Sequence, residues 1–357
     1  MMNNPRTVNI PDANFKAALL ANPEINPNGN TEILLTEAQT FTGKIDVSGK
    51  DITSLVGIEA FAALTDLSCA SNQLTALDLS SNRALVKLFC IKNQLTTLDL
   101  SRNTALTQFW CNENQLTVLD LSNNRALVKL YCIKNQLVAL DLSSNRALVH
   151  LSCSSNQLTA LDLSNNTDLE QFACDSNQLT VLDLSHNTTL TFLSCNSTRL
   201  ATLDLCNSIA LKTLSCISCK LITLDISRNT ALTYLHCAGN QLTTLDLSNN
   251  IALTYLHCAF NQLTTLEISN SNVLTKFWCN SNQLIALDLS KNVSLVELSC
   301  NKNQLKSLNV SNNSALTKLW CNENQLRILD VSRNVALVWL YCNENQLTDL
   351  DVSHNGK

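Results

Sequence analysis

The sequence predicts a solenoid, in which the chain forms a series of similar coils and one strand from each coil contributes to a parallel β-sheet along one face. The first observation is a cysteine that recurs every 21 residues. The second is the surrounding pattern L-x-x-L-x-C-x-x-N-Q-L-T-x-L-D-L-S-x-N-x-A, which repeats without an insertion. A fixed period of about 20 to 50 residues is typical of repeat architectures. The cysteines lie at Cys69, Cys90, Cys111, Cys132, Cys153, Cys174, Cys195, Cys216, Cys237, Cys258, Cys279, Cys300, Cys321 and Cys342.

The composition excludes several other classes of protein. The net charge is -5, 45% of the residues are hydrophobic, and no apolar stretch approaches the length of a membrane span. We therefore expect neither a nucleic-acid-binding face nor membrane insertion. Six glycines and four prolines in 357 residues also argue against disorder and a collagen-like repeat.

Residues 1–63 lack the repeat, and we expect them to form a helical N-terminal cap with a lead-in strand. Pro11 and Asp12 are a helix start signal, and the amphipathic residues Phe15, Ala18 and Leu19 follow. Ile45 and Val47 are predicted to form an atypical first strand. A cap is expected because the first repeat would otherwise expose its core and its sheet edge.

Within this cap, one segment has the spacing of an EF-hand calcium loop. Asn26, Asn28, Asn30 and Glu37 fall at ligand positions 1, 3, 5 and 12. Neutral amides replace the usual aspartates and Thr31 stands where glycine is preferred, so we favour a simple turn between two helices over a calcium site. We expect no cofactor.

Residues 64–357 divide into fourteen repeats. In each one, L-x-x-L-x-C ends in an alternation of apolar and variable residues, which predicts a short strand whose Leu and Cys point inward. The Asn-Gln-Leu segment turns the chain, and L-D-L-S brings a second apolar set back over the same core. Twenty-one residues leave too little chain for a full helix, so we expect an extended return path or a single helical turn. No C-terminal cap is recognisable.

We interpret the cysteine ladder as packing, because buried cysteine behaves as a small, polarizable hydrophobe. Disulfides are the alternative, since strands about 4.8 Å apart lie within the Cα range of a disulfide. In-register parallel strands, however, point their Cβ atoms side by side. A second ladder of asparagines, from Asn72 to Asn345, is expected to bond backbone groups of its own and the adjacent turn. It is interrupted at Thr198 and Cys219.

Two cysteines lie outside the ladder. Cys206 replaces a serine and is the candidate accessible thiol, while Cys219 forms a C-x-x-C pair with Cys216. No second C-x-x-C pair completes a tetrahedral metal site, so we favour the interpretation that Cys219 occupies the asparagine slot.

The strand segment, for example Leu85, Leu88, Cys90, Asn93 and Leu95, resembles that of the leucine-rich repeat family. Repeats of 21 residues with a cysteine at the third apolar position are similar to those of the bacterial internalins. Residues 10–41 resemble the helical cap of that family, and residues 51–67 resemble its lead-in to the first repeat. The resemblance implies a leucine-rich-repeat solenoid with a parallel sheet on one face and extended or short-turn return segments on the other. It says little about the ligand.

Function is expected at the outward strand positions, because the inward ones are committed to packing. All four tryptophans and all four tyrosines lie one or three residues before a ladder cysteine. Aromatic residues favour strands in general, but repeated exposed tryptophan is typical of interfaces. The predicted binding face comprises Phe89, Trp110, Tyr131, Tyr234, His236, Tyr255, His257, Trp278, Trp320, Trp339 and Tyr341. Lys87, Lys92, Lys129, Lys134 and Arg146 predict that its early repeats are basic.

These observations predict a non-catalytic, monomeric module that binds a macromolecule, with a protein ligand favoured. Carbohydrate binding and a structural spacer are the alternatives. His236 and His257 lie on neighbouring strands, but no third metal ligand is evident and no nucleophile pairs with a base. The first ten residues contain no signal peptide. Together with the missing C-terminal cap, this predicts a fragment of an exported, extracellular or bacterial surface protein, with a cytoplasmic protein as the alternative.

Overall fold

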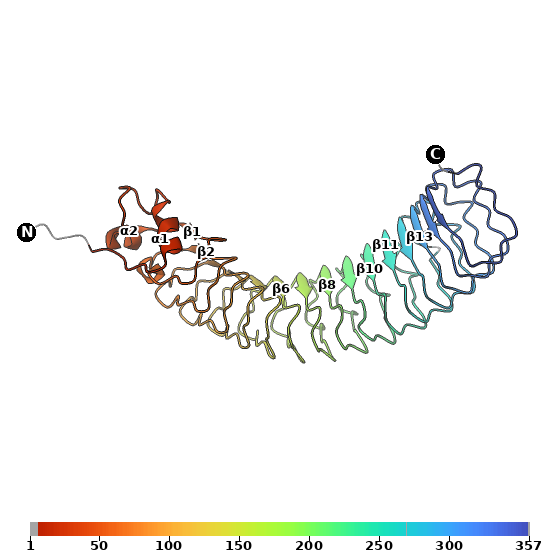
Figure 1. Ribbon diagram of the computed structural model, residues 1–357. Coiled ribbons are helices and arrows are strands. Elements are labelled where there is room, and N and C mark those ends of the chain that lie inside the picture. The colour runs from red at the N-terminus through yellow and green to blue at the C-terminus, as the bar shows by residue number, and fades with distance from the viewer. Residues whose placement is uncertain (1–5, 269, 356–357) are drawn as a thin grey trace, which may run out of the picture. The chain divides into compact units, whose positions relative to one another are not determined.

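The computed structural model describes residues 6–268 and 270–355 (Figure 1). The chain divides into two compact units, Met1–Gln178 and Leu179–Lys357. The first unit begins with the helices α1 (Ala13–Leu20) and α2 (Leu35–Thr40), the strand β1 (Lys44–Asp46) and the 3-10 helix η1 (Ile58–Ala60).

The remaining strands each contain three residues and recur every 21 residues. The first unit holds β2 (Asp66–Ser68), β3 (Lys87–Phe89), β4 (Gln108–Trp110), β5 (Lys129–Tyr131), β6 (His150–Ser152) and β7 (Gln171–Ala173). The second holds β8 (Phe192–Ser194), β9 (Thr213–Ser215), β10 (Tyr234–His236), β11 (Tyr255–His257), β12 (Lys276–Trp278), β13 (Glu297–Ser299), β14 (Lys318–Trp320) and β15 (Trp339–Tyr341).

Helix α1 begins where the sequence predicts. The Asp12 side chain caps it, because its Oδ1 accepts hydrogen bonds from the backbone N–H groups of Asn14 and Phe15 at 3.0 and 2.9 Å. The other carboxylate oxygen accepts one from the N–H of Thr53 at 2.8 Å, which ties the helix to the segment that leads into the repeats. The predicted first strand is β1, which contains Ile45 but ends before Val47, and it pairs in parallel with β2. The boundary of the cap at residue 63 stays a prediction.

Within each unit the strands pair in parallel with a shift of one repeat. Leu88, for example, lies opposite Leu67 on one side and Phe109 on the other. The central residue of each strand from β2 to β14 is buried, and most of the flanking residues are only partly exposed. The strands are short because the chain turns directly after each cysteine. Between residues 64 and 355 the described chain contains strands, turns and bends but no helix, which confirms the expected return path.

The ladder cysteines are core residues. Thirteen of the fourteen are 0% exposed, and their backbone N–H groups bond to the neighbouring strand, as Cys90 does to the carbonyl of Trp110 at 2.9 Å. Burial raises the pKa of the Cys69, Cys132 and Cys237 thiols to about 12. The cysteines with free thiols include Cys69, Cys90, Cys111, Cys132, Cys153, Cys216, Cys237, Cys258, Cys279, Cys300, Cys321 and Cys342. The geometry therefore supports packing rather than disulfides.

The asparagine ladder also has the expected role. Asn93 donates hydrogen bonds from its side-chain amide to the carbonyls of Cys90 in its own repeat and Cys69 in the preceding one, at 3.1 and 3.0 Å. Its Oδ1 accepts a hydrogen bond from the N–H of Leu74 at 3.0 Å. Cys219 takes over part of this role, since its Sγ lies 3.0 Å from the carbonyl oxygen of Cys195. This contact supports its assignment to the asparagine slot.

A further asparagine ladder runs through the return segments, and the sequence analysis missed it. Asn124 is 0% exposed and donates to the carbonyls of Leu100 and Asn103 at 3.1 and 2.9 Å. The same two bonds recur at Asn82, Asn103, Asn145, Asn229, Asn250, Asn292, Asn313 and Asn334. These amides bind consecutive repeats on the side opposite the strands.

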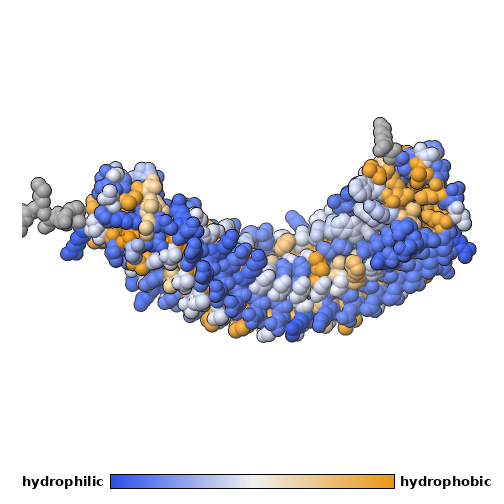
Figure 2. Space-filling view, in the orientation of Figure 1, coloured by the Kyte–Doolittle hydropathy of each residue, from blue (hydrophilic) through white to orange (hydrophobic). Residues whose placement is uncertain are grey.

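The last repeat differs from the others. Cys342 is only partly buried, and so are Leu340 and Leu347, whose equivalents in earlier repeats are fully buried. Figure 2 shows hydrophobic side chains gathered at this end of the second unit. Cys342 is therefore the exception to the inward-facing, packed cysteine ladder that the sequence predicts, because no described repeat packs against its outer side.

Candidate binding face

The predicted binding-face residues are all outward-facing side chains of strands. They lie on β3–β5 in the first unit and on β10, β11, β12, β14 and β15 in the second. Most are partly exposed, and Trp339 and Tyr341 are the most open, at 52% and 45%. The structure thus places each of these residues on a strand face, and it groups them into separate aromatic clusters.

The cluster in the first unit is a row of three rings on adjacent strands. Trp110 packs edge-on against Phe89, with ring centroids 4.5 Å apart, and against Tyr131 at 5.3 Å. Its indole nitrogen is buried and has no hydrogen-bond partner among the described residues. Trp110 is therefore wedged between its neighbours, and this row presents a packed surface rather than a projecting side chain.

The cluster in the second unit extends over β10, β11 and β12. The rings of Tyr234 and Tyr255 stack at 4.2 Å, those of His236 and His257 stack at 4.1 Å, and Trp278 stands edge-on to His257 at 4.9 Å. Burial lowers the pKa of His236, and burial with the charge of His236 lowers the pKa of His257 to about 4. Both imidazoles are therefore neutral at neutral pH. The two imidazole rings stack face to face, which gives no support to a metal bridge between them. Among the described residues there is also no group of three or more His, Cys, Asp or Glu placed to hold a metal ion.

A hollow opens on the strand face beside this cluster. Its volume is about 350 Å³, and it is lined by His257, Phe260, Trp278, Asn280, Ser299, Asn301 and Trp320. Two of the predicted tryptophans thus lie at one concave site on the strand face. The amides and the hydroxyl supply polar groups at the same place.

Phe260 is a member of this hollow that the sequence analysis missed. It lies two residues after a ladder cysteine, where the chain adopts a left-handed conformation in repeat after repeat; its φ is 55° and its side chain is 60% exposed. Ser, Lys, Glu or Gly fills this position in the other repeats. A bulky residue with positive φ is uncommon, and such strain collects at functional sites. The signal in the sequence was the single aromatic residue at an otherwise polar position of the repeat.

The charges on the strand face are largely paired with one another. The Nζ of Lys87 lies 3.0 Å from Oδ1 of Asp66, and that of Lys134 lies 3.5 Å from Oε1 of Glu113. The sequence predicts a basic zone in these early repeats. This expectation is wrong for Lys87 and Lys134, because the 21-residue register sets a carboxylate beside each of them on the preceding repeat.

The EF-hand-like loop is held by its own hydrogen bonds. Asn28 donates to Glu37, the Asn28 side chain accepts from the N–H of Asn30 at 2.8 Å, and Glu37 accepts from the N–H of Leu34 at 2.8 Å. Asn26 donates to the carbonyls of Leu20 and Asn30. Oδ1 of Asn30 accepts a hydrogen bond from the N–H of Glu32 at 2.9 Å. The four predicted ligands are thus brought together, but all four already satisfy polar groups of the loop, as in a turn between two helices.

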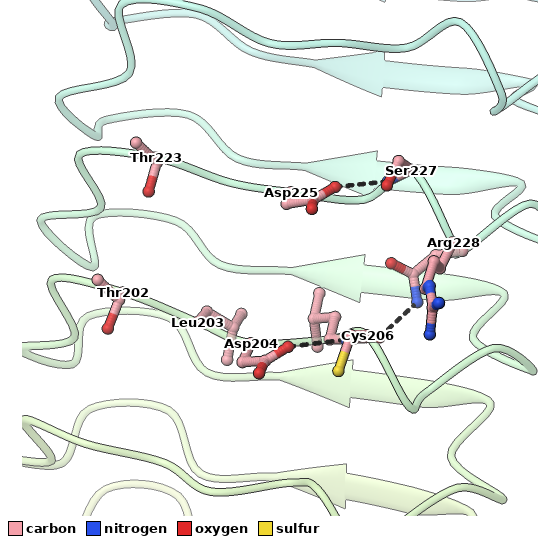
Figure 3. Close-up of a pocket in the computed structure, with 10 residues that line it drawn as sticks. Thr202, Leu203, Asp204, Cys206, Thr223, Asp225, Ser227 and Arg228 are labelled. Carbon is pink, nitrogen blue, oxygen red and sulfur yellow. Dashed lines mark hydrogen bonds between the residues drawn. The ribbon is translucent and has the colours of Figure 1, made fainter.

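Cys206 is exposed, as predicted. It lies in a hollow between two return segments, where Oδ1 of Asp204 accepts a hydrogen bond from the Cys206 N–H at 2.9 Å (Figure 3). This bond lowers the pKa of Asp204, while the hydrogen bond to Asp204 raises that of the thiol. Asp225 makes the equivalent bond to Ser227, and a matching hollow occurs around Asp78 and Asp99. The feature is therefore part of the repeat geometry rather than a special site.

A solenoid of 21-residue repeats, with one parallel strand face and buried ladders of cysteine and asparagine, defines a leucine-rich repeat protein. The chain is similar to the functional domain of InlJ from Listeria monocytogenes, which includes a cysteine ladder. The two are 35% identical with a TM-score of 0.83, over 98% of this chain and 73% of that one. The chain belongs to the internalin family of leucine-rich repeat proteins.

More distant structures share the fold. A leucine-rich repeat protein of Leptospira interrogans is 20% identical with a TM-score of 0.78, over 88% of this chain and 93% of that one. The ectodomain of the Arabidopsis thaliana receptor kinase GASSHO1/SCHENGEN3, solved in complex with CASPARIAN STRIP INTEGRITY FACTOR 2, is 23% identical with a TM-score of 0.73, over 85% and 40% of the two chains. No protein-family model and no curated protein matches the sequence. Neither α1 nor α2 is long enough to cross a membrane, and the described residues contain no other candidate span.

Proposed function

We propose that this chain is a non-catalytic module that binds a protein partner through the outward side chains of its strand face. The observation that carries the proposal is the confinement of every tryptophan and tyrosine to two outward rows of the strands. Tryptophan and tyrosine supply large contact areas and dominate the energetics of many interfaces. Their placement on one face, away from the return segments, supports a surface selected for contact.

The proposed interface is broad. The aromatic side chains lie on three strands of the first unit and on five strands of the second, and in the second unit paired charges such as Lys318 and Glu297 lie among them, 3.1 Å apart. A stable protein interface buries about 1,200 to 2,000 Å² in total, which several adjacent strands are needed to supply. The plant receptor ectodomain of the same fold, solved in complex with CASPARIAN STRIP INTEGRITY FACTOR 2, is consistent with this use of the scaffold.

Membership of the internalin family supports an adhesin-like role at a bacterial surface, with a protein of another cell or host as the partner. In this role the repeats present the strand face, and the cap covers the first repeat. If the chain were only a structural spacer, it would need no aromatic rows on its strands. Substitutions of these aromatic residues would then have no effect on binding.

The test starts from the full chain, immobilised and used to capture surface proteins of candidate partner cells. The captured partner is identified and its affinity measured by surface plasmon resonance. Replacing Trp320 or Trp339 with Ala should weaken binding by about 2 kcal/mol or more, because a few aromatic anchors carry most of the energy of an interface.

The matched control replaces Arg228 and Lys291, two exposed residues of the return segments, and should leave the affinity unchanged. If the Trp320 and Trp339 variants bind the partner as tightly as the unmodified chain does, and the Arg228 and Lys291 control loses binding, the interface lies on the opposite side of the repeats.

A further inference from the structure

The hollow on the second unit's strand face contains a slot between two tryptophans. Trp278 on β12 lies in register with Ser299 on β13, and Ser299 with Trp320 on β14. Strands in a sheet are about 4.8 Å apart, so the two tryptophan backbones are separated by about 9.6 Å. Because the intervening side chain is only a serine, space for one flat ring remains between the two indoles, within the volume of about 350 Å³.

The polar groups at this slot are arranged as donors. The Ser299 hydroxyl donates to Oδ1 of Asn301 at 2.7 Å and lies 3.4 Å from Oδ1 of Asn280. The Nδ2 groups of both asparagines donate no hydrogen bond to any described residue, and both side chains line the hollow. Two amide groups therefore stand ready to bond acceptors on a ligand beside the aromatic rings.

The slot is neutral. No Asp, Glu, Lys or Arg lines it, and His257 is uncharged at neutral pH because burial lowers its pKa to about 4. The nearest charged side chains on the same strands are Lys276 and Lys318, and both pair with Glu297, at 3.6 and 3.1 Å. Nothing in the slot favours an ion over an uncharged ligand.

From this geometry we propose that the slot between Trp278 and Trp320 binds a neutral pyranose ring of a glycan. A pyranose presents flat patches of C–H groups, which pack on the indole faces, and hydroxyls around its edge, which accept from the amides of Asn280 and Asn301. Phe260 adds an exposed aromatic wall. An apolar lining with a few placed polar groups is the usual composition of a small-ligand site.

A side chain of a protein partner fits the slot less well. An aliphatic or aromatic side chain would cover the two amide donors without bonding them, and a buried unsatisfied donor costs roughly 1 to 3 kcal/mol. A charged side chain would find no partner of opposite charge. The glycan site goes beyond the proposed protein interface and does not depend on it, because it rests on one slot rather than on the whole strand face.

The test uses the full chain on a printed array of neutral and sialylated oligosaccharides, followed by calorimetric titration with the methyl glycoside of the terminal sugar in the strongest neutral hit. Neutral glycans should be retained. Ser299→Phe, which fills the slot and leaves both tryptophans in place, should lower the affinity at least tenfold. Ser215→Phe changes the same row on β9, away from the slot, and should bind as the unmodified chain does.

Retention of no neutral glycan, retention of sialylated glycans only, or undiminished binding by Ser299→Phe would each overturn the site. Should Ser299→Phe fail to fold, Phe260→Ser provides the test, because it restores a residue common at that turn while removing one wall; it too should weaken binding. Trp339→Ala lies outside the slot and should leave glycan binding intact. If Trp339→Ala loses protein binding but keeps glycan binding, the protein interface and the glycan site are separate, and either proposal can fail without the other.

Discussion

Phe260 shows how one residue can reveal a site that the repeat pattern conceals. Its backbone has the left-handed conformation that every repeat uses after the ladder cysteine, and its N–H bonds to the carbonyl of Asn280 at 2.9 Å. The turn therefore imposes this conformation on whatever residue occupies the position. A left-handed conformation costs a residue with a side chain roughly 1 to 2 kcal/mol, and the ring of Phe260, which is 60% exposed, offsets little of that cost by burial.

We predict that Phe260→Asn stabilises the protein by about 1 kcal/mol, because asparagine tolerates the left-handed region better than other residues with side chains. The measurement is the urea midpoint of the second unit's unfolding in the full chain. Val273→Asn removes another exposed apolar side chain, at a position without positive φ, and should give no such gain. A lower midpoint for Phe260→Asn would show that the ring contributes more by packing than its backbone costs.

The ladder thiols give a second prediction at the residue scale. Burial raises the pKa of Cys132 to about 12, whereas an unfolded cysteine ionises near pH 8.5. Above that pH the unfolded chain releases thiol protons that the folded chain keeps. Stability is therefore complete below about pH 8.5 and falls as the pH rises toward 12.

Between pH 7.5 and 10.5 each deeply buried thiol should account for about 2.6 kcal/mol of this loss. Cys132→Ala should therefore show a smaller fall in its urea midpoint across this range than the unmodified chain. Cys206→Ala should differ far less from the unmodified chain, because Cys206 is exposed and the pKa of its thiol is raised mainly by one hydrogen bond to Asp204 rather than by burial. Identical slopes for all three proteins would mean that the ladder thiols ionise while the chain is folded. A thiol titration should find Cys206 and part of Cys342 reactive in the folded protein and sixteen thiols in urea.

Among the elements, the turns depend most on the asparagine ladders. Asn93 satisfies two backbone carbonyls and one backbone N–H from two repeats. We predict that Asn93→Ala costs about 3 kcal/mol, because each buried polar group left without a partner costs roughly 1 to 3 kcal/mol. The measurement is chemical unfolding, with hydrogen exchange at Leu74 and Leu95 reporting the local opening.

Asn123→Ala is the matched control, since Asn123 is exposed in the neighbouring return segment and should cost little. If both substitutions lower the free energy of unfolding by a similar small amount, water replaces the hydrogen bonds of Asn93 when the turn opens. The asparagine ladder would then fix the alignment of neighbouring repeats without adding to stability.

Much of the fold follows from the sequence because the period fixes every inward position at once. The strands, the cysteine ladder and the first asparagine ladder were all predicted from that period. Asn124 and its equivalents were missed because a turn asparagine reads the same whether it is exposed or buried. Phe260 was missed because the pattern of apolar residues does not show that the backbone φ is positive at that position. The Lys87–Asp66 pair was missed because it joins side chains of two different repeats.

In the whole molecule, the inward side chains of each repeat form the core, and the outward side chains of the strands form the variable surface. Each repeat packs on its immediate neighbours, as in other solenoids. The outward strand positions are therefore free to vary without loss of the core. The aromatic rows, the neutral slot at Trp278 and Trp320, and the paired charges are all variations of this kind. By contrast, Asp78, Asp99 and Asp120 make the same turn hydrogen bond in three successive repeats.

The most direct test of the proposed binding face is a hydrogen-exchange footprint of the full chain with its captured protein partner. The account predicts slower exchange in the turns that follow the aromatic strands, residues 342–346 after β15 and 321–325 after β14, and unchanged exchange in the return segments around Arg228 and Lys291. Protection confined to the return segments, with free exchange along the strand face, would contradict it.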